Sequence, residues 1–485
     1  MDKNKCAMRF NQITFVVLML MVSTTFSQFN PNGYNSGNQR YDENFPPLSD
    51  TRQPNRATKR TQHNHRLPQS QTDGRVHFPG EDGNPGGQLA PGAAVPEKND
   101  KKQELLADTI TKFSLDMTKK LLEEENGNLV VSPASVAAVL SLLYQGVTDS
   151  SRTATELQNT LGLERKQSKN AFRTFINTLK GGPAGRDMIF ANAVFVEGAQ
   201  LDPEFKKVAT NAFNADIINT RFNNPVAASS TINDWVKTAT KGKIPSLVEP
   251  GGLDSTTKCV LTNAVFFKNV WKNVFDDERT IKKQFHINSG DGVHRQPKSV
   301  EAEFMHQSVK MVAGTNKTFG ARWIKIPFDD NVYSMFFVLP LEQDGIDAVV
   351  RNMQPEDLKS ILETKTIKTC HIGVPKFKIG YSKSLVNALS KMGVGSIFEP
   401  HNRDLTKIVQ NQPIYVSDAL QKAVISIDEQ GATAAAATAI TVNTLSLASY
   451  YDEVRFLADQ PFLVIIAKDT TPMFMAKIKD PSLTA

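Results

Sequence analysis

The sequence predicts a mixed α+β fold in which helices gather early in the globular part and strands gather late. Apolar residues recur at helical spacing in the early part, and β-branched apolar runs dominate the later part. The chain has 485 residues, of which 40% are hydrophobic, so it can build one large globular unit or two ordinary ones. This composition excludes collagen, coiled-coil and wholly disordered proteins.

The predicted helices come first. From Leu106 to Leu121 apolar residues stand three or four positions apart, and Gly127 ends this first helix. A second helix follows at once, with Ser132 as its N-cap and Pro133 at its first position. Further helical patterns cover residues 153–161, 166–179, 203–213 and 227–239.

Strands are predicted where apolar and β-branched residues form short runs. These runs cover residues 188–196, 259–267, 334–339, 366–372, 423–427, 462–467 and 472–478. The last two follow each other closely in the sequence, and the chain contains no internal repeat.

Residues 1–27 have the layout of a secretory signal peptide. Basic residues precede a ten-residue apolar run at 13–22, and the small residues Thr25 and Ser27 suit cleavage before Gln28. The run is short for a transmembrane helix, so an uncleaved anchor is the minor alternative. We therefore expect a secreted, extracellular protein with no membrane partner. Asn316, in the sequon Asn-Lys-Thr, would then be a glycosylation site.

Residues 28–102 differ in composition from the rest, with much Pro, Gly, Asn and Arg and little aliphatic content. Such a segment buries too little apolar surface to offset its ordering entropy, so it is predicted to be a disordered extension. Its basic stretch at 52–66 could dock polyanions or present Lys59-Arg60 to a processing protease; a solvated tail is the preferred interpretation. The globular domain is predicted to span residues 103–485.

Charge and motifs exclude several function classes. The 56 Lys and Arg against 50 Asp and Glu are spread along the chain, so the net charge of +6 does not indicate a nucleic-acid partner. Cys259 and Cys370 are the only cysteines beyond the predicted signal peptide, which is too few for a disulfide scaffold. Hydrolase, nucleotide-binding and metal-binding motifs are absent from the sequence. We therefore expect no enzymatic activity, no metal and no cofactor.

The most informative segment is an uncharged stretch from Gln430 to Tyr451, composed mostly of Ala, Thr and Ser. Its alanines favour a helix, whereas its threonines, Ile440 and Val442 disfavour one. A flexible linker is the alternative, but linkers are usually rich in Gly, Ser and Pro or charged. Neither a stable helix nor an ordinary linker therefore accounts for the composition of this stretch.

These residues resemble the serpin family, in particular its inhibitory members. Residues 429–438 are similar to the serpin hinge, and residues 456–462 are similar to the signature that follows the reactive loop. Further landmarks are residues 128–135, 233–236, 240–244 and 261–268, the last followed by Trp271. The similarity runs from about Gln103 to Pro481.

The resemblance implies a fold with three β-sheets, about nine helices and an exposed reactive-centre loop at about residues 430–452. It also implies a serine protease inhibitor that acts as a suicide substrate: a protease cleaves the loop, and the cut loop inserts into the main sheet before the acyl-enzyme is hydrolysed. A non-inhibitory serpin, acting as a carrier, chaperone or storage protein, is the alternative. It is less favoured because the small-residue hinge is retained. We expect a monomer.

The resemblance also assigns site residues. The hinge comprises Glu429, Gln430, Gly431, Ala432, Thr433, Ala434, Ala435, Ala436, Ala437 and Thr438. The region that controls opening of the main sheet comprises Ser132, Ser135, Asn263, Trp271 and Gln421. Gln421 stands where the family usually has His; Gln can donate and accept hydrogen bonds but does not titrate near neutrality. Sheet opening should therefore be retained, while the sequence leaves its threshold open.

The target class follows from the position of the scissile bond. Counting sixteen residues from Glu429, as the family implies, gives Leu445–Ser446, whereas counting back from Phe456 brings Tyr450 into competition. Either residue suits the apolar pocket of a chymotrypsin-like protease better than the acidic pocket of a trypsin-like one.

A glycosaminoglycan is a lesser expected partner. Arg165, Lys169 and Arg173 are spaced i, i+4, i+8 on the predicted helix where some serpins bind glycosaminoglycans. A solvated helix face is the preferred interpretation of this spacing.

Overall fold

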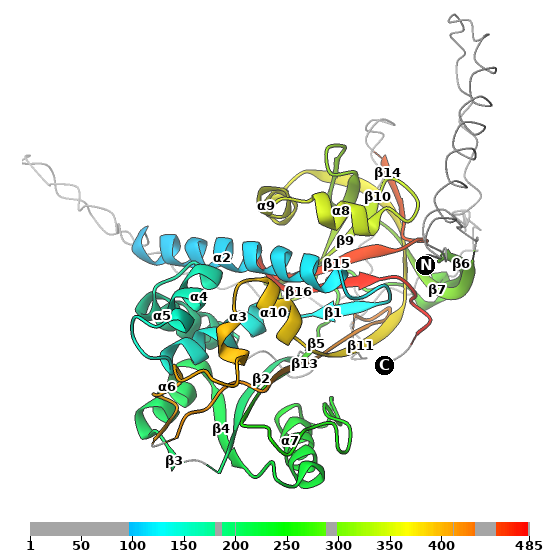
Figure 1. Cartoon of the computed structure of the whole chain (residues 1–485). Coiled ribbons are helices and arrows are strands. Elements are labelled where there is room, and N and C mark those ends of the chain that lie inside the picture. Colours follow the sequence, from blue (N-terminus) through cyan, green and yellow to red (C-terminus); the bar gives the residue numbers. More distant parts are fainter. Residues whose placement is uncertain are drawn as a thin grey trace, which may run out of the picture. The chain divides into compact units, whose positions relative to one another are not determined.

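Nine α-helices and three β-sheets make up the described part of the chain, which confirms the predicted architecture (Figure 1). The computed structural model describes residues 97–179, 187–198, 200–287, 298–410, 412–431 and 453–483. The helices are α2 (Glu97–Leu122), α3 (Pro133–Gln145), α4 (Arg152–Leu161), α5 (Arg165–Thr178), α6 (Pro203–Phe213), α7 (Pro225–Ala239), α8 (Ile346–Asn352), α9 (Pro355–Glu363) and α10 (Val386–Lys391).

The five-stranded sheet positions the candidate site. Its strands stand in the order β11-β13-β5-β2-β4. Their bounds are Phe377–Ser384 for β11, Asp418–Ile427 for β13, Cys259–Lys268 for β5, Asp187–Glu197 for β2 and Ala215–Thr220 for β4.

The largest sheet has nine strands in the order β1-β16-β15-β9-β8-β7-β10-β14, with β6 paired to β7. Its strands are β1 (Leu129–Val131), β16 (Thr471–Ile478), β15 (Phe462–Lys468), β9 (Tyr333–Pro340), β8 (Ala321–Pro327), β7 (Ser299–Asn316), β10 (Ile367–Pro375), β14 (Glu453–Leu457) and β6 (Ile281–His286). The third sheet pairs β12 (Val409–Gln410) with β3 (Gln200–Leu201), and two short 3-10 helices span Asp277–Arg279 and Ser396–Phe398.

Strand β5 is buried on both faces, which explains its nearly continuous apolar sequence. Leu261 and Val265 belong to the main core that also contains α3, whereas Val260 and Ala264 pack in a second cluster with Ile232 of α7. Helices α3 and α7 therefore lie on opposite sides of the five-stranded sheet (Figure 1). Because helices pack on both faces of this sheet, a further strand can join it only at an edge or between two neighbouring strands.

Helix α3 is apolar on all sides because it is enclosed between the two large sheets. It contacts β16 of the nine-stranded sheet and β5 of the five-stranded sheet. Ser132 occupies the N-cap position and Pro133 begins the helix, as predicted, but the Ser132 side chain does not cap the helix. Its Oγ instead donates to the Met473 carbonyl in β16, 2.7 Å away. Among the described residues no helix is long and apolar enough to cross a membrane.

Candidate functional site

The turn after β13 is fastened to the segment that follows β5. Strand β13 ends at Ile427, and the amide of Gly431 donates to the Asp428 carbonyl at 3.0 Å. The Trp271 indole Nε1 also donates to the Asp428 carbonyl at 2.9 Å, and the Trp271 backbone amide donates to the Gln430 carbonyl at 3.1 Å. The start of the predicted loop is therefore held at the end of β5 by two bonds from a single residue.

Gly431 adopts a conformation that excludes a side chain. Its φ of +100° lies in the left-handed region, which favours glycine. A Cβ added there would lie 2.5 Å from the Asn269 carbonyl oxygen and 2.6 Å from the Trp271 amide nitrogen. Only glycine lets the chain leave β13 this close to the backbone that follows β5.

Glu429 is the buried charge of the hinge, 8% exposed. Its Oε1 lies 3.0 Å from the Lys376 Nζ and accepts a 2.8 Å hydrogen bond from the Thr280 hydroxyl. Its carbonyl accepts from the Phe275 amide at 2.9 Å, and Lys376 also lies 3.2 Å from a Glu303 carboxylate oxygen. Burial raises the pKa of Glu429, but hydrogen bonds from its own backbone, Lys376 and Thr280 outweigh burial and hold that pKa below its usual value of 4.5.

Trp271 lies at the hinge and not with the other four residues expected in the sheet-opening region. Its ring is 1% exposed and stacks on Phe328, with 4.5 Å between centroids and 7° between planes. Phe275 meets it edge-on at 6.1 Å. The five residues expected in the sheet-opening region therefore lie at two separate places, and Trp271 lies at the place where the loop is anchored.

The remaining four residues come together in a buried polar cluster. Gln421 Oε1 accepts from the Ser132 amide at 3.1 Å, and Gln421 Nε2 donates to the Ser132 carbonyl at 3.2 Å and to Asn263 Oδ1. Asn263 Nδ2 in turn donates to the Ser135 hydroxyl and to Asn192 Oδ1. Every member is less than 5% exposed. Asn192 is the member that the sequence analysis missed; it lies directly opposite Asn263 in the β2–β5 pairing.

The cluster sits on a parallel seam between β13 and β5. The pairing runs from Asp418 opposite Val260 to Ile425 opposite Phe267, while the flanking pairs β11–β13 and β2–β5 are antiparallel. Because β13 and β5 run in the same direction, both end at the hinge. A chain that reversed there and entered the seam would run antiparallel to both strands, which is a favourable ladder geometry.

The predicted loop connects the two large sheets. It follows β13 of the five-stranded sheet and precedes β14, which pairs in parallel with β10 in the nine-stranded sheet. The hinge residues 432–438, the predicted bond Leu445–Ser446 and its competitor Tyr450 lie outside the described residues. The described part thus gives the two ends of the loop, at Gly431 and Glu453.

The predicted sequon lies at the end of β7. Asn316 is partly exposed, and Lys317 and Thr318 after it are exposed. The Asn316 Oδ1 accepts a hydrogen bond from the Thr318 amide at 2.7 Å. The sequon therefore occupies a turn at the surface, between β7 and β8.

The three basic residues of α5 are not equivalent. The Arg165 guanidinium pairs with Asp149 and lies 4.9 Å from the centre of the Tyr144 ring. Lys169 is partly buried, whereas Arg173 is exposed. A polyanion on α5 would therefore compete with Asp149 for Arg165.

The sequence and the fold of this chain are both similar to those of known proteins. A family model described as serpin (serine protease inhibitor) matches residues 108–481. The chain is 30% identical to alaserpin of Manduca sexta over 383 residues, 78% of this chain and 95% of that one, and 32% identical to antitrypsin of Bombyx mori over 292 residues, 60% and 72% of the two chains. The crystal structure of Manduca sexta serpin-12 is 31% identical, with a TM-score of 0.68 over 78% of this chain and 99% of that one.

A second solved structure, native protease nexin-1 with heparin, is 25% identical and has a TM-score of 0.67 over 79% of this chain and 99% of that one. The family model, these relatives and the loop that joins the five-stranded sheet to the nine-stranded sheet agree: the chain belongs to the serpin family.

Proposed function

We propose that this protein is a secreted serine protease inhibitor that traps a chymotrypsin-like protease as a suicide substrate. The observation that carries this proposal is the parallel β13–β5 seam, with the hinge fastened at its end by Trp271. A cleaved loop anchored there has a seam into which it can insert as a sixth strand, antiparallel to both neighbours. The chemistry belongs to the protease; this chain supplies the conformational change.

The covalent step takes place on the loop. The protease serine attacks the carbonyl of the scissile residue, the peptide C–N bond breaks, and an ester C–O bond forms. The serine proton passes through the protease histidine to the leaving amine, which remains attached to β14. The residues before the cut are then free to insert into the seam and to move the attached protease before water hydrolyses the ester.

The loop composition suits insertion. Side chains alternate between the two faces of an inserted strand, and the residues from Gly431 to Thr438 are small and uncharged on both faces. No charge is therefore buried as the strand enters. About fourteen inserted residues at roughly 0.5–1.5 kcal/mol per hydrogen bond give on the order of 10 kcal/mol, similar to the stability of a whole domain.

The experiment is complex formation with chymotrypsin, followed on a denaturing gel. We expect a covalent adduct with the unmodified protein. The hinge variants Ala432→Arg and Ala434→Glu should instead be cleaved without trapping, because a charge stalls the strand at the seam. Ala448→Glu, on the β14 side of the predicted bond, is the matched control and should still form the adduct. Unchanged trapping rates in the hinge variants would contradict the insertion mechanism.

A non-inhibitory serpin should give a different result on the denaturing gel. A carrier, chaperone or storage serpin would be cut cleanly or left intact by every serine protease in a panel. The absence of any adduct with the unmodified protein would favour this alternative over inhibition.

The proposal includes export and glycosylation. The predicted signal peptide and the exposed sequon support both. Secreted protein should begin at Gln28, and a glycosidase should reduce its mass unless Asn316 is replaced by Gln. Export with residues 1–27 retained would contradict the predicted cleavage.

A glycosaminoglycan on α5 is a lesser proposed partner. Helix α5 contains four basic residues and no acidic residue, but Arg165 is engaged with Asp149. Heparin should then raise the rate of protease trapping, and Arg173→Ala should weaken this effect. Rates that do not change with heparin would exclude this partner.

A further inference from the structure

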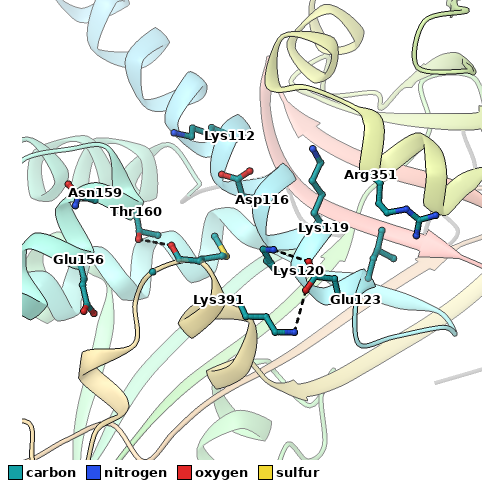
Figure 2. A pocket seen from close by; sticks show the side chains of 13 residues that line it. Lys112, Asp116, Lys119, Lys120, Glu123, Glu156, Asn159, Thr160, Arg351 and Lys391 are labelled. Atoms are coloured by element: carbon teal, nitrogen blue, oxygen red, sulfur yellow. Dashed lines mark hydrogen bonds and ion pairs between the residues drawn. The ribbon is translucent and has the colours of Figure 1, made fainter. Parts of the chain in front are cut away.

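A cavity of about 750 Å³ lies over the outer face of α2. Lys112, Asp116 and Lys119 line it from α2, Asn159 and Thr160 from α4, and Arg351 from α8. Figure 2 shows Asn159 and Thr160 on one side, Arg351 on the other, and α2 between them. The volume is typical of sites that hold small organic ligands. Helix α5 does not contribute to this cavity, so it is separate from the basic residues discussed above.

The cavity has an excess of positive charge. Five cationic and three acidic side chains line it. One acid, Glu156, has partners outside the cavity: Arg152, which also pairs with Glu399, lies 2.8 Å from one of its carboxylate oxygens, and the amides of Gly395 and Ser396 donate to the other. The lining as a whole carries five positive charges against three negative ones, and this excess favours an anionic ligand.

Part of this charge is held in place by the protein. Lys119 Nζ donates to the Met353 carbonyl at 2.7 Å, which fixes the ammonium without neutralising it. Lys120 and Lys391 lie 2.8 and 3.3 Å from the Glu123 carboxylate, and Lys391 also lies 3.3 Å from Glu124, which pairs with Lys383 (Figure 2). These three cations and two acids together retain one net positive charge. Because these cationic side chains are already ordered, they lose less conformational entropy when a ligand binds.

Neutral and acidic groups in the cavity suit hydroxyl groups. The Asp116 carboxylate can accept hydrogen bonds from the hydroxyl groups of a polyol, and the Asn159 amide can both accept and donate them. An inorganic anion alone would leave these groups without a role and would meet Asp116 as a like charge. Cations from α2 and α8 therefore line the same cavity as hydrogen-bonding groups from α2 and α4, and this combination matches a sugar-like molecule with charged esters.

We propose that this cavity binds a polyhydroxylated molecule that carries sulfate or phosphate esters. The esters contact Lys112, Lys119 and Arg351, and free hydroxyl groups contact Asp116 and Asn159. Among the described residues, none from β13, β5 or the hinge lines this cavity. Its ligand is therefore expected to bind the intact inhibitor and the cleaved form alike.

The test uses titration calorimetry on the full chain with sucrose octasulfate, inositol hexakisphosphate and glucose 1,6-bisphosphate. Lys112→Ala/Arg351→Ala should weaken binding about tenfold or more, because two charge-assisted contacts are lost. Lys206→Ala/Lys207→Ala removes the same charge from exposed positions on α6 and should change the affinity less than about threefold. Binding of sucrose octasulfate alone would identify sulfate esters as the ligand class, and binding of the phosphates alone would identify phosphate esters.

Asp116→Ala tests the hydroxyl contacts. It should strengthen binding of the fully esterified sucrose octasulfate, because a like charge is removed, and weaken binding of glucose 1,6-bisphosphate, which has free hydroxyls. Equal strengthening of both would overturn the polyol assignment. If no probe binds, or if the α6 pair loses as much affinity as the cavity pair, the site itself is overturned. Unfolding temperatures of the unliganded variants show that they are folded.

Discussion

Glu429 and Lys376 form an ion pair of 3.0 Å at the point where the predicted loop leaves the five-stranded sheet. The Glu429 side chain is 10% exposed and that of Lys376 is 31% exposed, so the pair is shielded from water on the carboxylate side. Lys376 stands between β10 and β11, which belong to different sheets. The pair therefore ties the hinge to the junction between the two large sheets.

Lys376→Ala should reduce the free energy of unfolding by about 2 kcal/mol, because it leaves the buried Glu429 carboxylate without its cation. Lys378→Ala is the matched control: Lys378 is exposed on β11, and its loss should change the free energy by less than about 0.5 kcal/mol. Urea unfolding of the three proteins provides the measurement. Equal losses in both variants would mean that the pair contributes nothing specific.

Gly431→Ala should destabilise the protein by about 2 kcal/mol or more, because the added methyl group meets the backbone of Asn269 and Trp271 and because φ is positive. The neighbouring backbone cannot move away cheaply. Gly395→Ala is the control, since a Cβ there meets nothing within 4 Å. Thermal unfolding should separate the two variants clearly. A Gly431→Ala protein as stable as Gly395→Ala would contradict the close approach at the hinge.

Gln421→His should make the seam between β13 and β5 sensitive to pH. A neutral imidazole can replace only two of the three hydrogen bonds of Gln421, so we expect a loss of about 1 kcal/mol at pH 8. Burial disfavours the imidazolium and lowers its folded-state pKa, so stability is lost further as pH falls below about 6.5.

The measurement is the difference in urea midpoint between this variant and the unmodified protein, taken at pH 8 and at pH 5.5. Subtraction removes the contribution of histidines that both proteins share. If the difference in urea midpoint is the same at both pH values, protonation of a histidine at position 421 does not affect the stability of the polar cluster.

The unmodified protein should itself lose stability in mild acid through His306, which is 4% exposed in β7. Burial and, to a lesser extent, the positive charge of Lys283 lower the pKa of His306 to about 4. A hydrogen bond with the Ile372 backbone raises this pKa but does not offset the other two effects. Between pH 6.5 and pH 4 the unfolded chain binds the proton and the folded one does not, so stability falls as pH falls through this window.

We expect a loss of about 2 kcal/mol between pH 6.5 and pH 4.5, measured by urea unfolding. This range separates His306 from Glu429, whose lowered pKa removes stability only as pH falls below its usual value of 4.5. His306→Asn should flatten the dependence. If the variant keeps the slope of the unmodified protein, another group is responsible.

The local periodicity of the sequence predicted the helices better than the strands. Helix α6 was predicted with the bounds that it has, Pro203–Phe213, because its apolar face repeats regularly. The long strand β7 was missed, because consecutive buried residues such as Met305 and His306 interrupt the alternation that marks a strand. The first half of β13 was missed as well, since Gln421 is polar and its partners are distant in sequence.

The candidate site was predicted only in part, for a related reason. The family resemblance brought Ser132, Ser135, Asn263 and Gln421 into one group, but Asn192 lies in an apolar strand and only the pairing of β2 with β5 reveals its role. The position of Trp271 was also decided by tertiary contacts, through its bonds to the hinge backbone. Pairings between distant segments carry this information, and a single sequence does not show them.

Leu445→Arg should move inhibition from chymotrypsin-like to trypsin-like proteases. The prediction depends on the hinge count that places the scissile bond at Leu445–Ser446, outside the described residues. An apolar pocket accepts Leu, whereas the carboxylate of a trypsin-like pocket requires a cation. The rate of adduct formation with chymotrypsin should fall by at least about tenfold, and the rate with trypsin should rise by a similar factor.

Tyr450→Ala is the matched variant, since it should leave both rates nearly unchanged if Leu445 is the acylated residue. The mass of the peptide released from the adduct locates the cut independently, because a peptide that begins at Ser446 identifies Leu445. A peptide that begins at Tyr451 would move the bond to Tyr450 and retain the chymotrypsin-like class. Efficient trapping of trypsin by the unmodified protein would refute the class itself, because neither Leu445 nor Tyr450 can neutralise the acidic pocket.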